Sequence, residues 1–141
     1  MVLGIHSNVD PDGGFKDGHA WLSVRHSSGD AITVGLYPDG HPAVIDNGSE
    51  TDLRLNVEMA ATGKFEGKYN YYHNMTNLEA ARFSAYLNKS ASWLYSNTCA
   101  TWAANGFRYG TGTNVSAREW LLFGTPRTIS NSIQNLSPST P

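Results

Sequence analysis

A single cysteine stands at a position where a thiol becomes a nucleophile. Cys99, the only cysteine of the chain, follows the polar stretch 95–98 and opens a segment whose apolar residues recur at helical spacing. Unpaired backbone N–H groups and the positive end of the helix dipole lie at the start of a helix, and both favour thiolate over thiol. The sequence therefore predicts that Cys99 is a reactive nucleophile near neutral pH.

Such a nucleophile needs a base, and His19 is the best candidate. It opens the strand-like run 18–24 and lies on the face opposite the apolar residues of that run. The competing interpretation is that Cys99 is an inert core thiol and His19 a structural histidine, which is common for both residue types. Both residues follow turn-forming stretches, where sites are commonly built, and this context favours a nucleophile and base pair.

Composition limits the classes of protein to which the chain can belong. Its 141 residues are 40% hydrophobic and 16% charged, which predicts one globular domain with an apolar core. The net charge of −2 and the pI of about 6.2 argue against nucleic-acid binding through a basic surface. One cysteine excludes an intrachain disulfide framework. The histidines are scattered without metal-ligand spacing, so we expect neither a metal nor another cofactor.

Targeting signals are also missing from the sequence. No apolar stretch reaches the length of a membrane span, and the apolar run at the N-terminus ends at His6 before it could form the core of a signal peptide. We therefore expect a chain that is made in the cytoplasm and has no membrane anchor. It could also be the excised end of a longer protein.

Strand patterns dominate the first half of the chain. The chain begins almost directly with a turn at 10–14. The runs 21–25 and 31–37 alternate and flank a turn-rich linker, which predicts a β-hairpin. The second run carries Thr33 and Tyr37 on its more polar face, so either side chain could orient the imidazole of His19. Alternation predicts a half-buried strand over 53–59. We also expect a short strand at 43–46 and a strand or loop over 63–72.

Helix signals dominate the second half. Thr76 and Glu79 form a capping box, which predicts a helix to about Lys89. The helix that begins at Cys99 should end at Gly106 or Gly110. A second capping box at 116–119 predicts a helix through the apolar residues 120–123, and the Thr-Pro pair at 125–126 predicts a last helix with apolar spacing to residue 136.

Three short stretches carry a resemblance to a known family. They read Gly-His-Ala-Trp at 18–21, Tyr-Ser-Asn-Thr-Cys-Ala-Thr-Trp-Ala at 95–103 and Thr-Pro-Arg-Thr-Ile-Ser-Asn-Ser-Ile at 125–133. With a hairpin and a capped helix between the first two, the chain resembles the circularly permuted papain-like hydrolases. These include permuted NlpC-type cell-wall peptidases and relatives of lecithin-retinol acyltransferase, and in the unpermuted order the cysteine helix comes first. The proline-led third stretch resembles one in bacterial antibacterial effectors of this kind.

The resemblance implies roles for particular residues. Cys99 would attack an amide carbonyl, His19 would take its proton, and the N–H of Cys99 would help to hold the oxyanion. In several relatives an asparagine stands directly before the cysteine, whereas Thr98 separates Asn97 from Cys99 here. Thr33, Tyr37 and Asn97 are therefore our candidates for orienting the imidazole or holding the oxyanion.

The sequence thus predicts an α+β, papain-like hydrolase domain over 1–136 and a polar tail over 137–141. We expect a small antiparallel sheet packed against helices in circularly permuted order, with the histidine strand before the cysteine helix. The function implied by the resemblance is that of a cysteine peptidase or amidase that cleaves peptidoglycan stem peptides. Such an enzyme would be a secreted antibacterial toxin, for example a type VI secretion effector, that acts in the periplasm of a target cell and is neutralised by a cognate immunity protein.

Two alternatives stay open. The first is an acyltransferase, or a lipid- or protein-directed hydrolase, that uses the same cysteine and histidine. The second is a non-catalytic module that binds a polar ligand such as a glycan through exposed aromatic residues. The aromatic candidates are Trp21, Tyr69, Tyr71 and Tyr72.

Overall fold

The computed structural model describes residues 1–13, 18–38, 51–94, 97–119 and 123–136, and within them the chain has an α+β fold. Five strands form one sheet in the order β4-β3-β2-β1-β5, and every neighbouring pair is antiparallel. The predicted strand at 43–46 and the tail 137–141 lie outside the described residues. The sheet strands are β1 (Val2–Ser7), β2 (Ala20–Arg25), β3 (Ala31–Leu36), β4 (Leu53–Leu55) and β5 (Tyr69–Asn74).

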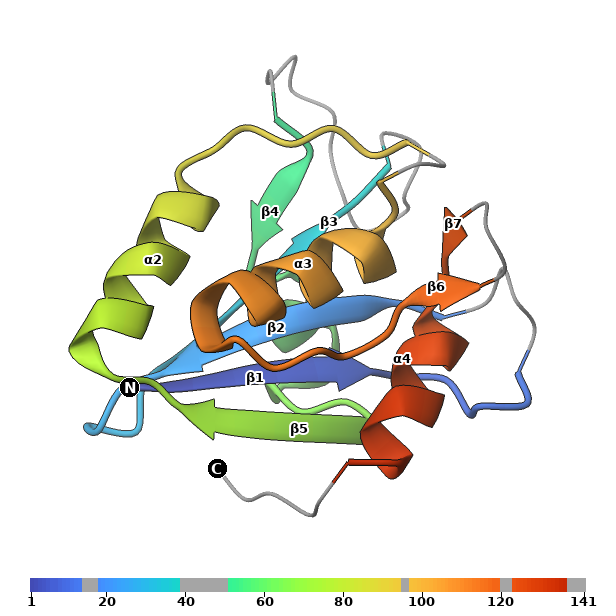
Figure 1. The fold of residues 1–141 in the computed structure, drawn as a ribbon, viewed down its shortest axis with the longest axis horizontal. Helices are drawn as coiled ribbons and strands as arrows, with labels where there is room; N and C mark the ends of the chain where they lie inside the picture. The colour runs from blue at the N-terminus through green and yellow to red at the C-terminus, as the bar shows by residue number, and fades with distance from the viewer. Residues whose placement is uncertain (14–17, 39–50, 95–96, 120–122, 137–141) are drawn as a thin grey trace.

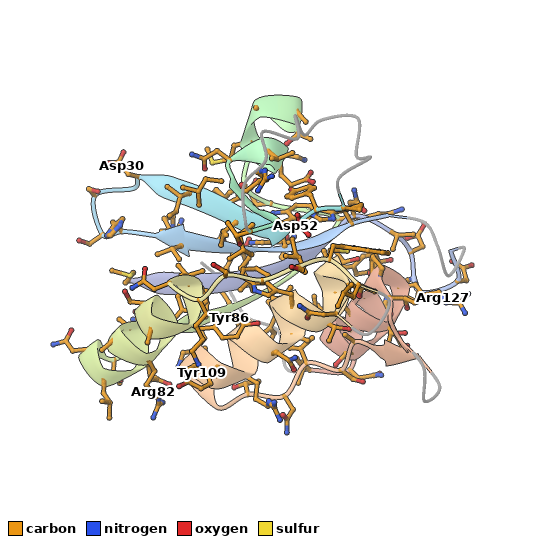
Figure 2. The ribbon with its side chains drawn as sticks, turned by 90° about the horizontal axis from the view of Figure 1, so that it is seen from above. Asp30, Asp52, Arg82, Tyr86, Tyr109 and Arg127 are labelled. Carbon is orange, nitrogen blue, oxygen red and sulfur yellow. The ribbon has the colours of Figure 1, made fainter. Side chains whose placement is uncertain are left out.

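Helices cover both faces of this sheet. Figure 1 shows α2, α3 and α4 in front of the strands, and the view from above in Figure 2 shows α1 on the opposite side. Because both faces are covered, the central strands are buried on both sides. The helices are α1 (Val57–Thr62), α2 (Asn77–Leu87), α3 (Cys99–Thr111) and α4 (Pro126–Gln134).

The apolar core lies between the sheet and α3. Alternate residues of β1, β2 and β3 point toward this helix and are buried there, as the alternation of the sequence predicted for the hairpin of β2 and β3. The side of α3 that carries aromatic and alanine residues packs against them. Members of the core include Leu3, Ile5, Leu22, Val34, Leu36, Trp102, Phe107 and Ile129.

Strand β1 lies inside the sheet, and the sequence did not predict it. It pairs with β2 on one side and with β5 on the other, although we expected the chain to start almost directly with a turn. Its sequence hides the strand because Gly4 interrupts a short apolar run and because His6 and Ser7 are buried polar residues. A strand covered on both faces lacks the alternation that marks a half-buried one.

The end of α3 also differs from the prediction. The helix continues through Gly106 and Gly110 to Thr111 and ends at Gly112, which has the left-handed conformation typical of a C-cap. A Cβ on Gly106 would lie 2.7 Å from Cε1 of Tyr86. Glycine stands inside the helix because it allows α2 to approach α3 closely, and this packing outweighs its poor helix propensity.

The predicted strand 53–59 is correct only for its first three residues. Strand β4 ends at Leu55, and Asn56, at φ 58°, adopts the left-handed conformation that asparagine tolerates better than most residues. The backbone N–H of Asn56 donates to the carbonyl of Thr33 at 2.8 Å, and its side-chain oxygen accepts the Thr33 N–H at 3.0 Å. This turn takes the chain off the sheet edge and starts α1.

The second capping box is wrong, because the segment forms a small hairpin. Strands β6 (Arg118–Glu119) and β7 (Phe123–Gly124) pair antiparallel, and the backbone N–H of Ser116 donates to the hydroxyl of Ser132. Residues 120–122, the rest of the predicted helix, lie outside the described part of the chain. Four apolar residues are too few to distinguish a helix from a strand by periodicity.

Three other predictions are confirmed. Both hydrogen bonds of the Thr76 and Glu79 capping box are present, and α2 ends at Leu87. Thr125 caps α4, with Pro126 in its first turn. The stretch predicted as strand or loop, 63–72, contains the start of β5.

Candidate active site

The backbone of His19 is held at the start of β2. Its N–H donates to the side-chain oxygen of Asn8 at 2.7 Å, and the Asn8 N–H donates to its carbonyl at 3.2 Å. Helix α4 holds the same loop, because the hydroxyl of Ser130 donates to the carbonyl of Val9. The end of β1 and α4 thus fix the position from which the imidazole extends.

The thiol of Cys99 lies beside the residue that follows His19. The ladder between β2 and β3 runs as far as the pair of Leu22 and Val34, and beyond that end the Ala20 N–H hydrogen-bonds to the Cys99 sulfur. The backbone N–H groups of Ala100 and of Cys99 itself also favour the thiolate. Three backbone donors therefore act on the thiol at the N-terminus of α3.

Thr98 fixes the start of α3. Its hydroxyl accepts the Thr101 N–H at 3.3 Å, which makes Thr98 the N-cap, and donates to the carbonyl of Gly124 at 2.9 Å. One side chain therefore caps the helix and ties it to β7. Thr98, the residue that separates Asn97 from Cys99, therefore has a defined structural role.

The expected lowering of the thiol pKa does not occur. Burial raises the pKa of Cys99 to about 11, and the negative charge of Glu58 adds to this effect, while the three backbone donors lower it by less. Only 8% of the residue is exposed, because Cys99 belongs to the apolar core. Desolvation thus outweighs the helix dipole, and the resting group is a neutral thiol.

Two aromatic rings hold the imidazole of His19. The Trp21 ring lies parallel to it within 11° at a centroid distance of 5.8 Å, and Tyr37 stacks on it at 4.3 Å. Gly35 makes this arrangement possible, since a Cβ there would lie 3.0 Å from both His19 Nε2 and Tyr37 Cε2. The imidazole therefore has a defined orientation in the free protein.

Glu58 is the site residue that the sequence reasoning missed. Its Oε1 lies 3.8 Å from Nε2 of His19 and accepts a hydrogen bond of 3.3 Å from the Tyr37 hydroxyl. Burial raises the pKa of Glu58, and the hydrogen bond from Tyr37 opposes that rise. The sequence predicted orienting candidates in the run 31–37, whereas Glu58 comes from α1. The signal that could have found it is the turn-forming Asn56 two residues before an acidic residue.

Of the three candidate orienting residues, the structure brings Tyr37 to His19. Thr33 pairs with Ser23, four residues along β2 from His19, which corresponds to about 13 Å at 3.3 Å per residue. The side chain of Asn97 donates to the carbonyl of Ser92, and its backbone pairs with Leu94. Thr33 and Asn97 thus have contacts away from the imidazole.

Of the four aromatic residues considered for ligand binding, Trp21 is buried, whereas Tyr69, Tyr71 and Tyr72 of β5 are partly exposed. Trp21 is 2% exposed and donates its indole N–H to the carbonyl of Phe65. Tyr71 packs edge-on against Phe107 in the core. The expectation of exposure is therefore wrong for Trp21, because both faces of β2 are covered.

The described residues contain no group of three or more His, Cys, Asp and Glu side chains that could hold a metal ion. None of the helices in this part of the chain combines the length and apolar character needed to cross a membrane. The Cys99 thiol and its backbone donors lie beside Ala20, the residue that follows His19, and the imidazole of His19 is held by Trp21 and Tyr37. These are the parts required for nucleophilic attack on a carbonyl.

Comparison with known proteins identified no relative of this chain. No protein-family model matches the sequence, and no significant match was found among curated proteins or among solved structures.

Proposed function

We propose that this protein is a cysteine hydrolase that cleaves amide bonds, with Cys99 as the nucleophile and His19 as the base. One observation carries the proposal: the Cys99 sulfur accepts the backbone N–H of Ala20, directly after a histidine whose ring is held by Trp21 and Tyr37. The backbone next to His19 therefore lies beside the thiol at the N-terminus of α3, which supports the pairing of Cys99 with His19.

The raised pKa of Cys99 favours a neutral resting pair over a preformed thiolate and imidazolium. In the first step the sulfur attacks the amide carbonyl while its proton passes to a ring nitrogen of His19. The N–H groups of Cys99 and Ala100 act on the thiol and are placed to donate to the oxyanion. The imidazolium then returns the proton to the departing amine, and water hydrolyses the thioester.

The substrate class and the biological role extend the proposal through the resemblance of the sequence. The histidine strand β2 precedes the cysteine helix α3, which is the order of the permuted papain-like hydrolases. We infer that the substrate is a peptidoglycan stem peptide and that the protein is an antibacterial toxin, of the type VI secretion effector kind, with a cognate immunity protein. Its place of action would then be the periplasm of the target cell.

The test expresses the protein in a Gram-negative host with and without a periplasmic export signal. The exported wild type should lyse or arrest the host, while the cytoplasmic form should be tolerated, because a wall-cutting amidase meets its substrate only outside the inner membrane. Cys99→Ala should abolish both toxicity and the release of peptide fragments from purified peptidoglycan. Toxicity that persists in the exported Cys99→Ala variant would exclude catalysis by this thiol as its cause.

A second candidate function is acyl transfer or lipid hydrolysis by the same pair, and an apolar groove favours it. The groove has a volume of about 240 Å³ and lies between β4 and the end of α2, two strands from Ala20. Its apolar walls include Val34, Leu53, Leu55 and Leu87. Equal toxicity from cytoplasm and periplasm, together with release of fatty acid from phospholipid vesicles, would favour this function over the cleavage of peptidoglycan.

A further inference from the structure

A buried carboxylate of α1, the helix on the face of the sheet opposite α3, lies close to the imidazole of His19. Glu58 Oε1 and His19 Nε2 are 3.8 Å apart, and their side chains are 12% and 10% exposed. Carboxylates are rarely buried to this extent without partners, because the charged form loses its hydration. The partners of Glu58 therefore explain why it is tolerated at this position.

Tyr37 connects the carboxylate to the base. Its hydroxyl donates to Oε1 of Glu58, the same oxygen that faces His19, and its ring stacks on the imidazole. One side chain thus holds both members of the pair. Burial, the nearby charge of Glu58 and the hydrogen bond to it raise the pKa of Tyr37, so this hydroxyl stays a donor throughout the physiological range.

The backbone fixes Glu58 in this place. Asn56, two residues earlier, forms two hydrogen bonds with the backbone of Thr33 in β3. The first turn of α1, which carries Glu58, is therefore tied to the strand that leads to Tyr37. The described titratable groups whose charges act on one another here are His19, Tyr37, Glu58 and Cys99.

We propose that Glu58 is the positioning residue of the site: its carboxylate, held by the Tyr37 hydroxyl, directs Nε2–H of His19 toward itself and stabilises the imidazolium that forms when the thiol loses its proton. With Nε2 protonated, Nδ1 is the nitrogen that can accept the thiol proton. The ring orientation then comes from Trp21 and Tyr37, and the tautomer comes from Glu58. The catalytic part of this role rests on the proposed function, whereas the effect on His19 does not.

A competing role for Glu58 predicts results of the opposite sign. The negative charge of Glu58 raises the pKa of the Cys99 thiol, so its direct effect on the nucleophile is unfavourable. If Glu58 acted on Cys99 alone, Glu58→Gln would lower the thiol pKa, speed alkylation and leave His19 unchanged. If Glu58 positions the base, the same variant lowers the pKa of His19 and slows any step that needs the imidazole to accept a proton.

The experiment is an NMR titration of the full chain, which follows the ring ¹⁵N signals of His19, assigned with a His19→Gln variant. Glu58→Gln should lower the pKa of His19 by about one unit, because an opposite charge within hydrogen-bonding or ion-pair distance is lost, and should reduce the share of the Nε2–H tautomer. The matched control is Asp30→Asn, which removes a carboxylate from the exposed tip of the hairpin between β2 and β3 (Figure 2) and should change neither.

Tyr37→Phe is the second variant, which keeps the ring stack and loses only the hydroxyl. Because the hydroxyl lowers the pKa of Glu58, its loss should leave less carboxylate ionised and lower the pKa of His19 by a smaller amount. An unchanged His19 pKa and tautomer in both variants would overturn the proposal. A shifted His19 in a protein that hydrolyses no amide would leave the positioning role intact and remove the proposed function instead.

Discussion

His19 and Cys99, the two members of the proposed pair, differ in how closely their state in the free protein matches the state needed for reaction. The imidazole of His19 is held between two rings, whereas the thiol of Cys99 is buried, neutral and raised in pKa. A preformed thiolate is therefore not the resting state. In the proposed mechanism, Cys99 therefore becomes reactive by proton transfer to His19 when a carbonyl is bound.

The rate at which Cys99 is alkylated measures the thiolate content of the free protein directly. At pH 7 the folded protein should react with iodoacetamide on the order of a hundredfold more slowly than the same chain unfolded in urea, because a pKa of about 11 leaves much less thiolate than an ordinary thiol has. The rate is followed by mass spectrometry of the modified protein. A folded protein that reacts faster than the unfolded chain would show a preformed thiolate and refute the neutral pair.

Gly35 gives a second prediction about the held imidazole. In Gly35→Ala, the new Cβ would press on both His19 and Tyr37, each at 3.0 Å, so the ring stack should shift and peptide hydrolysis should fall at least tenfold while the fold is retained. Gly110→Ala is the matched control, since its Cβ would meet Phe83 at 3.1 Å, away from the site. Comparable losses of hydrolysis in both variants would mean that general destabilisation, not the ring stack, is responsible.

In the proposed mechanism, the start of α3 is the helix terminus that carries the nucleophile. Thr98 caps the helix and bonds to β7, so it sets the position of Cys99 and of the N–H groups around the sulfur. Thr76 caps α2 in a similar way, through an exposed capping box. The two caps are chemically alike and differ in their distance from the site.

This pair of threonines allows a matched test of the helix start. Thr98→Ala and Thr76→Ala should each lower the free energy of unfolding by about 1 kcal/mol, measured by urea denaturation, because each loses an N-cap. Thr98→Ala should in addition reduce the hydrolysis rate, since it also loses the bond to Gly124 that anchors the helix start. Equal hydrolysis rates in the two variants would show that Thr98 contributes stability alone.

The strands β1, β2 and β5 are joined by a buried polar array. His6 Nδ1 contacts the side-chain oxygen of Asn70 at 2.6 Å, and Nε2 contacts the hydroxyl of Ser23 at 2.7 Å. His6 is fully buried, and this burial lowers its pKa to about 4. The array satisfies both ring nitrogens, and the loss of hydration in the interior disfavours the charged imidazolium.

Folding stability should therefore depend on pH through His6. Unfolded, this histidine takes up a proton near pH 6.5, whereas the folded protein does so only near pH 4. The unfolded state binds more protons in this window, so the free energy of unfolding falls as the pH falls from 6.5 to about 4, by about 3 kcal/mol at 1.36 kcal/mol per pKa unit.

Urea denaturation between pH 7 and pH 4 checks this prediction. His6→Gln, which keeps a polar side chain without an imidazole, should lose most of that slope, and the difference between variant and wild type removes the contribution of Glu58 and the other carboxyl groups. Parallel stability curves for the two proteins would mean that His6 is not the titrating group.

Local signals in the sequence were enough for the hairpin and for the starts of three helices. A threonine before a periodic apolar segment marks each of these starts, at Thr76, Thr98 and Thr125, because the hydroxyl that satisfies a free N–H is close by in the chain. The choice of Cys99 as the residue at such a start depended on the same local chemistry. These features involve neighbouring residues, so they can be recognised in the sequence alone.

The surroundings of His19 and Cys99 required the tertiary structure. Tyr37 reaches His19 through strand pairing, and Glu58 reaches it because Asn56 turns α1 over the sheet. The raised pKa of Cys99 likewise comes from the burial of α3 against the sheet, which the pattern of a helix start does not reveal. Burial and long-range contacts set the charge of a group as strongly as its local position does, and both arise only when distant segments pack together.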